Sequence, residues 1–369
     1  MKKISFILPS FEVGGIESNF ISAANYLKSS EFEPELVYWF EGGELKKKID
    51  PGVIVTKLKV SSLFSLLIKL IYHYNKSRPA IVQTSMYMIG NIAMIAKIFS
   101  FHKPKIIIGA HSNFHSTCKA SENLVDEFIL RKLSSIFYKR ADKIVAVSEG
   151  VKNGLIKSLN LEESKIKVIY NGVISKKHRE KKFVTPKHSW FSLKNICLVC
   201  SIGRLSPVKG IYELVCAFRR AHKLNDNLRL IIIGEGEEAV RIEKYLNTHS
   251  MNEYVEIIGF RENYYSYLDN SDIYVLNSYY EGMSNILAEA LTTDTKIIST
   301  NCEHGPIELL KDVKESKLID VNNENQLVNA IYDFSKTKKI KRENVPHLKN
   351  FYFNESMNKY SNVYIELLS

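Results

Sequence analysis

Two carboxylates stand eight positions apart where an apolar run begins: Glu281 and Glu289. Between them, Ser284 and Asn285 are both residue types that cap helix N-termini, so the segment after them is predicted to be a helix that buries Glu289. A buried carboxylate is rare without a partner, and a carboxylate just before a helix lies near free N–H groups. Two explanations of this pair are equally good. Either both carboxylates belong to a ligand site, or one Glu is exposed and the other is neutralised by a neighbouring cation.

A second segment carries two cations, Arg204 and Lys209, between Gly203 and Gly210 and ahead of an expected helix. Cations that meet free N–H groups at the start of a helix suit a diphosphate. The alternative is a surface loop with two solvated cations.

Paired glycines, Gly14 and Gly15, lie between the first expected strand and the first expected helix. Glycine allows a ligand to approach the backbone closely, although a tight turn explains the pair equally well. The loop does not match G-x-G-x-x-G, which disfavours a dinucleotide site.

Short β-branched runs alternate with helix-length amphipathic segments, which predicts an α/β protein with parallel sheets and crossover helices. The expected strands are 4–8, 35–40, 81–84, 105–109, 143–147 and 167–170 in the first half, and 196–202, 228–233, 254–258, 273–276, 296–299 and 317–319 in the second.

The alternation stops after Asn171-Gly172, where a polar, basic segment follows, and then restarts. We therefore expect two Rossmann-like, doubly wound domains whose strand ends face a central cleft. The expected boundaries are 1–172 for the first domain, 173–193 for a linker and 194–350 for the second domain, with a last helix at about 351–369 that packs back on the first.

The charge is uneven along the 369 residues. Residues 1–172 hold 24 Lys and Arg against 15 Asp and Glu, a net charge of +9, whereas residues 173–369 have a net charge of only +2. A basic half indicates an anionic partner there, such as nucleic acid, an anionic membrane or a phosphorylated substrate. Zinc-finger spacing and the RRM signature are both missing from the sequence, so no nucleic-acid partner is expected.

The cysteines predict a reduced, cytoplasmic protein because they are few and odd in number. Cys197 and Cys200 form a C-x-x-C inside an apolar strand, without a second pair, so we interpret them as core residues. No apolar run reaches the roughly 20 residues of a membrane span, and the start of the chain does not resemble a signal peptide.

The order of the motifs is more specific than any one of them. Along the chain come Gly14-Gly15, His111, Ser148-x-Gly150, Asn171-Gly172, Gly203-Arg204 with Lys209-Gly210, Gly234-x-Gly236, Gly259-Phe260, Glu281-x7-Glu289 and Gly305-Pro306-x-Glu308. This order resembles the family 4 retaining glycosyltransferases of the GT-B fold, and the resemblance covers essentially the whole chain. The Glu-x7-Glu element with the two cations is its specific part; the glycine pairs are not.

The resemblance implies a donor site in the second domain. Arg204 and Lys209 match the cations on the donor diphosphate, Glu289 matches the carboxylate on the ribose hydroxyls, and Glu281 matches the acid at the donor sugar. The backbone N–H groups that face sugar and phosphate are those of Gly282, Met283, Ser284 and Asn285.

Two residues of the first domain also have counterparts in the family. His111 matches a histidine near the reacting centre, although a histidine that merely packs in the cleft wall is the alternative. Gly15 matches the loop that closes on the phosphate. The acid that many relatives carry after Asn171-Gly172-Val173 is replaced by Ile174-Ser175, so no role is assigned there.

No Asp-x-Asp occurs in the chain, so no metal or other cofactor is expected, and the two cations would meet the charge of the departing diphosphate. The resemblance implies transfer with retention, in which the leaving group helps to deprotonate the acceptor. Gly305-Pro306-x-Glu308 and Asn285 resemble members that build bacterial surface polysaccharides. The expected donor is therefore a UDP-linked sugar, and the expected acceptor is a glycan or a lipid-linked sugar.

Three questions stay open in the sequence. Residues 57–78 combine an apolar helix with flanking cations, which fits either peripheral binding to an anionic membrane or a helix packed on its sheet. A non-catalytic GT-B subunit that binds a partner transferase or an acceptor chain is the alternative function. A nicotinamide enzyme or epimerase lacks its fingerprint.

Overall fold

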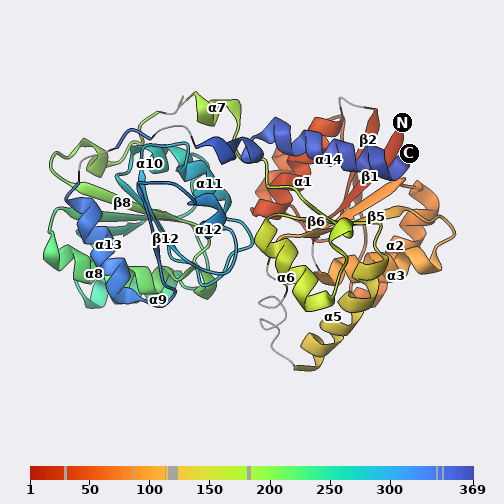
Figure 1. Ribbon diagram of the computed structural model, residues 1–369, viewed down its shortest axis with the longest axis horizontal. Coiled ribbons are helices and arrows are strands. Elements are labelled where there is room, and N and C mark those ends of the chain that lie inside the picture. Colours follow the sequence, from red (N-terminus) through yellow and green to blue (C-terminus); the bar gives the residue numbers. More distant parts are fainter. Residues whose placement is uncertain are drawn as a thin grey trace. The chain divides into compact units, whose positions relative to one another are not determined.

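The computed structural model describes residues 1–28, 31–85, 87–112, 114, 124–180, 184–337, 340–342 and 345–369. The chain forms two compact units, which are described separately (Figure 1). The first unit joins Met1–Gly172 to Phe353–Ser369, and the second is Val173–Tyr352.

The first unit is built on a seven-stranded parallel sheet with the order β3-β2-β1-β4-β5-β6-β7. Its strands are β1 (Lys2–Ile7), β2 (Phe32–Tyr38), β3 (Ile54–Lys57), β4 (Ile81–Thr84), β5 (Lys105–Ala110), β6 (Lys143–Ala146) and β7 (Ile166–Val168). Its helices are α1 (Gly15–Leu27), α2 (Leu63–Ser77), α3 (Tyr87–Phe99), α5 (Leu124–Phe137), α6 (Glu149–Leu159) and α14 (Phe353–Leu368), with short 3₁₀ turns at Glu44–Lys48, Tyr138–Arg140 and Glu163–Lys165.

Helix α14 returns to the first unit from the far end of the sequence and lies beside α1 on the same face of the sheet (Figure 1). Met357, Tyr360 and Tyr364 join the core that also contains Phe6 and Phe20. The Tyr364 hydroxyl donates a 2.6 Å hydrogen bond to Oε1 of Gln83 on β4. The last helix is therefore part of the first unit's core.

Strand β3 was not among the expected strands. It is four residues long and lies at the edge of the sheet with alternating half-buried and exposed positions, so its apolar signal is weak. Strand β2 also starts earlier than expected and runs through Pro34. Pairing with β3 begins only at Glu35, so Pro34 has a strand on one side alone, where a missing N–H is tolerated.

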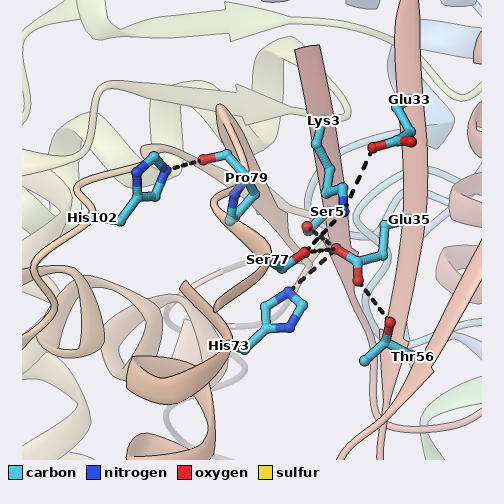
Figure 2. Close-up of polar contacts among 9 residues, drawn as sticks. All are labelled: Lys3, Ser5, Glu33, Glu35, Thr56, His73, Ser77, Pro79 and His102. Atoms are coloured by element: carbon cyan, nitrogen blue, oxygen red, sulfur yellow. Dashed lines mark hydrogen bonds and ion pairs between the residues drawn. The ribbon is translucent and has the colours of Figure 1, made fainter. Parts of the chain in front are cut away.

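A buried polar cluster joins α2 to the sheet (Figure 2). The Glu35 carboxylate on β2 accepts hydrogen bonds from Ser5 at 2.5 Å and Thr56 at 2.6 Å, and lies 3.3 Å from Nε2 of His73 on α2. Ser77, the last residue of α2, donates a further 3.3 Å bond. Burial raises the pKa of Glu35, but His73, Ser5 and Thr56 outweigh it and bring the pKa to about 2. Glu35 is thus a charged anchor beneath α2.

The second unit contains a six-stranded parallel sheet with the order β10-β9-β8-β11-β12-β13. Its strands are β8 (Cys197–Ile202), β9 (Leu228–Ile233), β10 (Val255–Ile257), β11 (Ile273–Leu276), β12 (Lys296–Thr300) and β13 (Ser316–Ile319). Its helices are α7 (Lys176–Arg179), α8 (Ile211–Leu224), α9 (Ala239–Thr248), α10 (Tyr264–Asn270), α11 (Asn285–Ala290), α12 (Pro306–Leu309) and α13 (Glu324–Ser335), with 3₁₀ turns at Ser189–Ser192, Pro207–Lys209 and Pro346–Phe351.

Two parallel sheets, each wound in both directions from its first strand, give the fold class that the alternation of elements predicts. The expected linker at 173–193 belongs to the second unit and carries α7 and a 3₁₀ turn, while its residues 181–183 lie outside the described part. Within the described residues, no helix combines the length and hydropathy that crossing a membrane requires.

Candidate functional site

The specific motifs of the second unit lie where its strand order reverses. Strands β8 and β11 are neighbours in the sheet but not in the sequence, so the loops that follow them leave the sheet in opposite directions. In open α/β sheets, the carboxyl ends of the strands at such a reversal are the usual ligand position. Arg204 and Lys209 follow β8, and Glu281 follows β11.

Two hydrogen bonds join these two loops. Asn277 donates from Nδ2 to the carbonyl of Gly210 over 2.8 Å, and the N–H of Tyr279 donates to the carbonyl of Val208 over 2.8 Å. Gly210 has a φ of +59°, and a Cβ there would collide with the Asn277 carbonyl. Only glycine fits this turn, which sets the position of Lys209 just before it.

Lys209 and Glu281 form the charged centre of the site. Nζ of Lys209 lies 2.6 Å from Oε1 of Glu281, which also accepts a 2.7 Å hydrogen bond from the Ser278 hydroxyl. Glu281 is 9% exposed and Lys209 28% exposed at their side chains. The acid is therefore buried and held, while the cation keeps a side toward solvent.

Glu289 is buried in α11, as expected, and its partner is a phenol. Tyr264 on α10 donates to both carboxylate oxygens, at 2.9 and 3.0 Å. Burial raises the pKa of Glu289 to about 8 although the Tyr264 hydrogen bond opposes the shift. At neutral pH the carboxyl group is mostly protonated, because no cation among the described residues pairs with it.

The start of α11 resolves the capping alternative in favour of Ser284, whose hydroxyl accepts from the N–H of Leu287 at 3.3 Å. Gly305, in the loop after β12, packs against this turn. A Cβ on Gly305, which has a φ of +77°, would lie 3.2 Å from Cα of Met283. The Ser284 cap on one side and Gly305 on the other thus hold the backbone of Gly282, Met283 and Asn285 in place.

Arg204 differs from Lys209. Its side chain is exposed, and it makes no ion pair with any residue that the structure describes. An exposed cation on the loop after β8 remains available to an anionic ligand.

Gly15 and His111 both lie at the carboxyl edge of the first unit's sheet. Gly15 is exposed and begins α1 directly after the β1 loop, at that sheet's own reversal of strand order between β1 and β4. His111 follows β5, and its ring lies edge-on to Phe20 of α1 with the ring centres 6.3 Å apart. Gly109 makes room for the ring, since a Cβ there would lie 2.8 Å from Nε2.

The His111 imidazole is neutral at physiological pH, since burial lowers its pKa to about 4. Its Nε2 atom is buried without a hydrogen-bond partner within the described part of the chain. A buried polar atom that lacks a partner is costly, so this nitrogen is suited to a ligand.

The structure thus places the second unit's predicted residues on the loops and helix that follow β8 and β11, with Lys209 and Glu281 in contact, and places the other two on the first unit. Three further site residues carried no sequence signal: Asn277, Ser278 and Tyr264. Asn277 and Tyr264 act on residues distant in the sequence, for example Tyr264 on Glu289 across 25 positions, whereas Ser278 bonds to Glu281 only three positions on. Cys197 and Cys200 are strand residues of β8, and burial raises the pKa of both thiols to about 12, so neither is reactive.

The arrangement combines groups that suit a phosphorylated sugar. Two cations can bind phosphate oxygens, a buried acid beside one of them can accept from sugar hydroxyls, and Glu289 with Tyr264 can exchange hydrogen bonds with a diol. None of these groups is a nucleophile activated by a neighbouring base.

Both halves of the chain match glycosyltransferase family models. Residues 13–177 match the model described as Glycosyltransferase Family 4, and residues 187–346 match the model described as Glycosyl transferases group 1. The first match covers most of the first unit and ends five residues into the second, the other lies within the second unit, and together they take in most of the chain. The chain belongs to the family 4 glycosyltransferases of the GT-B fold.

Curated relatives are distant. An uncharacterised glycosyltransferase of Methanocaldococcus jannaschii is 28% identical over 59% of the chain and 54% of its own length. The N-acetylgalactosamine-N,N'-diacetylbacillosaminyl-diphospho-undecaprenol 4-alpha-N-acetylgalactosaminyltransferase of Campylobacter jejuni is 27% identical over 60% of the chain. The chain thus spans 54% and 57% of the lengths of these two proteins. The capsular polysaccharide biosynthesis glycosyltransferase CapM of Staphylococcus aureus is 27% identical over 71% of the chain and 70% of its own length.

Solved structures support the fold over the full length. A glycosyltransferase of Rickettsia africae superposes with a TM-score of 0.76 at 19% identity, covering 100% of this chain and 99% of its own. Anabaena Alr3699/HepE in complex with UDP superposes with a TM-score of 0.73 at 16% identity, covering 100% and 97%.

Proposed function

We propose that the protein transfers a sugar from a UDP-linked donor, with retention of configuration and without a metal ion, to a glycan or lipid-linked acceptor in cell-surface polysaccharide synthesis. The observation that carries the proposal is the Lys209–Glu281 ion pair at the strand reversal of a unit that matches a glycosyltransferase family and that also contains the buried carboxyl of Glu289.

In this proposal the donor nucleotide binds at the carboxyl edge of the second unit's sheet, between the loops that follow β8 and β11. Arg204 and Lys209 bind the diphosphate, and the ribose hydroxyls take over the hydrogen bonds that Tyr264 alone now gives Glu289. Glu281 receives sugar hydroxyls, and the N–H groups from Gly282 to Asn285 hold sugar and phosphate. Because the Lys209 charge is already placed, it can stabilise the charge that develops on the leaving diphosphate.

For Gly15 and His111 we infer the roles that the family resemblance implies, contact with the donor phosphate and with the donor sugar. His111 is neutral, so it orients the donor sugar or accepts a hydrogen bond without adding a positive charge next to an oxocarbenium-like transition state. The leaving diphosphate takes the acceptor proton. The chain has no Asp-x-Asp, and its two cations occupy the role that a metal plays elsewhere.

The donor nucleotide and the pathway are inferred from neighbours in structure and sequence. One structural neighbour was solved with UDP, and two relatives are named for a diphospho-undecaprenol acceptor and for capsular polysaccharide. We place the work of the protein in the cytoplasm, where nucleotide sugars are made.

The test begins with UDP binding measured by calorimetry. Arg204→Ala and Lys209→Ala should each weaken binding about tenfold or more, because each removes a charge-assisted contact. Arg229→Ala on β9, which bonds only backbone carbonyls, is the matched control. Unchanged affinity in both site variants would refute the donor site.

Catalysis is tested separately with a panel of UDP-sugars. Slow release of UDP should be seen with one sugar, persist in EDTA, and vanish in Glu281→Ala. With an acceptor in hand, NMR of the product should show the donor's own anomeric configuration. An inverted product, or a rate restored only by a divalent ion, would contradict those parts of the proposal.

A further inference from the structure

One surface of the first unit exposes far more apolar side chain than folding explains. Of the 21 large hydrophobic residues exposed in the described part of the chain, seven lie on α2 or at the end of α3. They are Leu63, Phe64, Ile68, Tyr72, Ile98, Phe99 and Phe101. We call this set the α2–α3 face, since the two helices pack side by side on the sheet. Apolar surface gathered in this way marks a binding site.

The spacing of apolar residues on α2 explains why one side of this helix stays exposed. On α2, Phe64, Ile68 and Tyr72 recur every fourth residue and form one outer stripe, while Leu66 and Leu70 on the opposite side are buried. His73 and Ser77 bind that inner side to Glu35 (Figure 2). The helix therefore cannot rotate to hide its stripe without breaking a buried charged cluster.

The loop after α3 is held just as firmly. Asn75 near the end of α2 accepts from the N–H groups of Phe101 and His102 at 2.8 and 3.0 Å. His102 is also bonded to the carbonyl of Pro79 at 2.6 Å, as Figure 2 shows. Phe101 is consequently 94% exposed on an ordered loop beside the last turn of α2, which extends the stripe of Tyr72.

The charge of this region indicates what kind of partner binds the α2–α3 face. Between Asp50 and Glu122 the sequence has no acidic residue and nine Lys or Arg, which equals the whole net charge of +9 on residues 1–172. Lys59, Lys69, Lys76 and Arg78 make no ion pair with any described residue. Lys76 lies over the Tyr72 ring at 5.6 Å, so cation and aromatic ring share one surface.

We propose that the α2–α3 face docks on an anionic lipid bilayer, with Phe64, Ile68, Tyr72 and Phe101 in the acyl boundary and the lysines among the headgroups. An apolar stripe flanked by unpaired cations is the pattern of interfacial helices. Lysine is depleted at protein–protein interfaces, so a protein partner fits this surface less well. The Leu63 end of α2 follows β3, which places it at the same edge of the sheet as His111. Docking would bring this edge of the sheet close to a lipid-linked acceptor. The inference that docking serves acceptor binding rests on the proposed function.

The test is co-sedimentation of the full chain with phosphatidylcholine vesicles that contain about 30 mol % phosphatidylglycerol, or none. The wild type should bind the anionic vesicles about tenfold more strongly, and Phe64→Ser/Ile68→Ser/Tyr72→Ser should lose about tenfold or more of that binding. Lys69→Glu/Lys76→Glu should remove the preference for anionic lipid. Leu224→Ser/Val240→Ser/Ile365→Ser, which changes three residues 53%, 75% and 48% exposed on other helices, is the matched control.

The outcomes separate this proposal from the proposed function because no sugar transfer is measured. Wild-type protein that stays in the supernatant, or a triple variant that binds like its control, would overturn the docking surface and leave the donor site untouched. A change of oligomeric state in the triple variant without vesicle binding would instead identify an interface between copies. Melting temperatures equal to wild type establish that the serine variants fold.

Discussion

The positive charge of Lys209 has two possible partners, the Glu281 carboxylate and the diphosphate of the proposed donor. In the free protein it neutralises Glu281, while the proposed donor needs it at the diphosphate. A pair that is partly exposed contributes little to stability, so the contact holds the cation in place at small cost.

Removing the negative charge from Glu281 should therefore separate binding from catalysis. In Glu281→Gln, UDP affinity should rise about threefold to tenfold, since Lys209 no longer has a competing anion, whereas turnover of the sugar nucleotide should fall. Calorimetry with UDP measures the first effect. Glu238→Gln, which alters another buried acid with a cationic partner in the same unit, should leave UDP affinity unchanged. Weaker UDP binding in Glu281→Gln would show that the acid supports the nucleotide directly.

If Glu289 binds the donor as proposed, binding should depend on pH with a sign that follows from the surroundings of this carboxyl group. Its pKa is about 8 in the free protein because burial disfavours the charge. Ribose hydroxyls that donate to the carboxylate would lower this pKa, so donor binding releases a proton. Affinity must then rise with pH, and the rise must end near pH 8.

We predict that affinity for UDP-glucose rises between pH 6 and pH 8 by up to about tenfold per unit, and that it is flat in Glu289→Gln. A nucleotide sugar serves better than UDP here because its diphosphate has no group that titrates near neutrality. Titrations at several pH values decide the matter. A wild type as flat as the variant would mean that Glu289 keeps its proton in the complex.

The residues of the site could be predicted from the sequence to different degrees. Arg204, Lys209, Glu281 and Glu289 stand at fixed spacings on segments that read clearly as loops or helix starts. The Tyr264 partner could not be found because the contact joins two helices whose register depends on packing. The buried state of His111 Nε2 likewise could not be predicted, because it depends on packing against Phe20 of α1, which is far away in the sequence.

At the scale of elements, the turn between β8 and α8 sets the geometry of the site. Gly210 ends the 3₁₀ turn that contains Lys209 and forms the N-cap of α8. Two separate features require glycine at this position: the left-handed backbone and the close approach of the Asn277 carbonyl.

The two features can be separated with a second glycine. Gly259 has a similar φ, +69° against +59°, but the nearest atom to its Cβ position is 3.5 Å away at the end of the Glu235 side chain. Gly259→Ala should cost about 1 kcal/mol for backbone strain alone. Gly210→Ala should cost about 2–4 kcal/mol because the Asn277 carbonyl must also move, and it should weaken UDP binding. Urea unfolding and calorimetry provide the two measurements. Equal losses of stability would mean that the loop after β11 shifts freely.

Strands and crossover helices were predictable at this scale because their apolar runs are long. Edge strand β3 was not predicted, since four half-exposed residues carry no clear period. The start of β2 was missed for a related reason, because Pro34 argues against a strand unless the pairing partners on each side are known.

At the scale of the whole molecule, each unit has a hydrophobic core of its own. The two cores differ in whether their residues come from one continuous stretch of the sequence. The second unit's core is continuous in sequence, from Val199 to Ile331. The first unit's core is completed by Met357, Tyr360, Val363 and Tyr364, which arrive after the whole second unit. The stability of the first unit therefore depends on the C-terminal helix.

Tyr364 tests this dependence, and the chain has a suitable pair of probes. Its two tryptophans are Trp39 in the first unit and Trp190 in the second. Tyr364→Ala removes a fully buried ring and its hydrogen bond to Gln83, which should cost the first unit about 3–5 kcal/mol. In a Trp190→Phe background, the fluorescence of Trp39 should show unfolding at clearly lower urea. In a Trp39→Phe background, the Trp190 transition and UDP affinity should stay unchanged, because neither depends on α14. A parallel shift of both transitions would show instead that the units unfold as one.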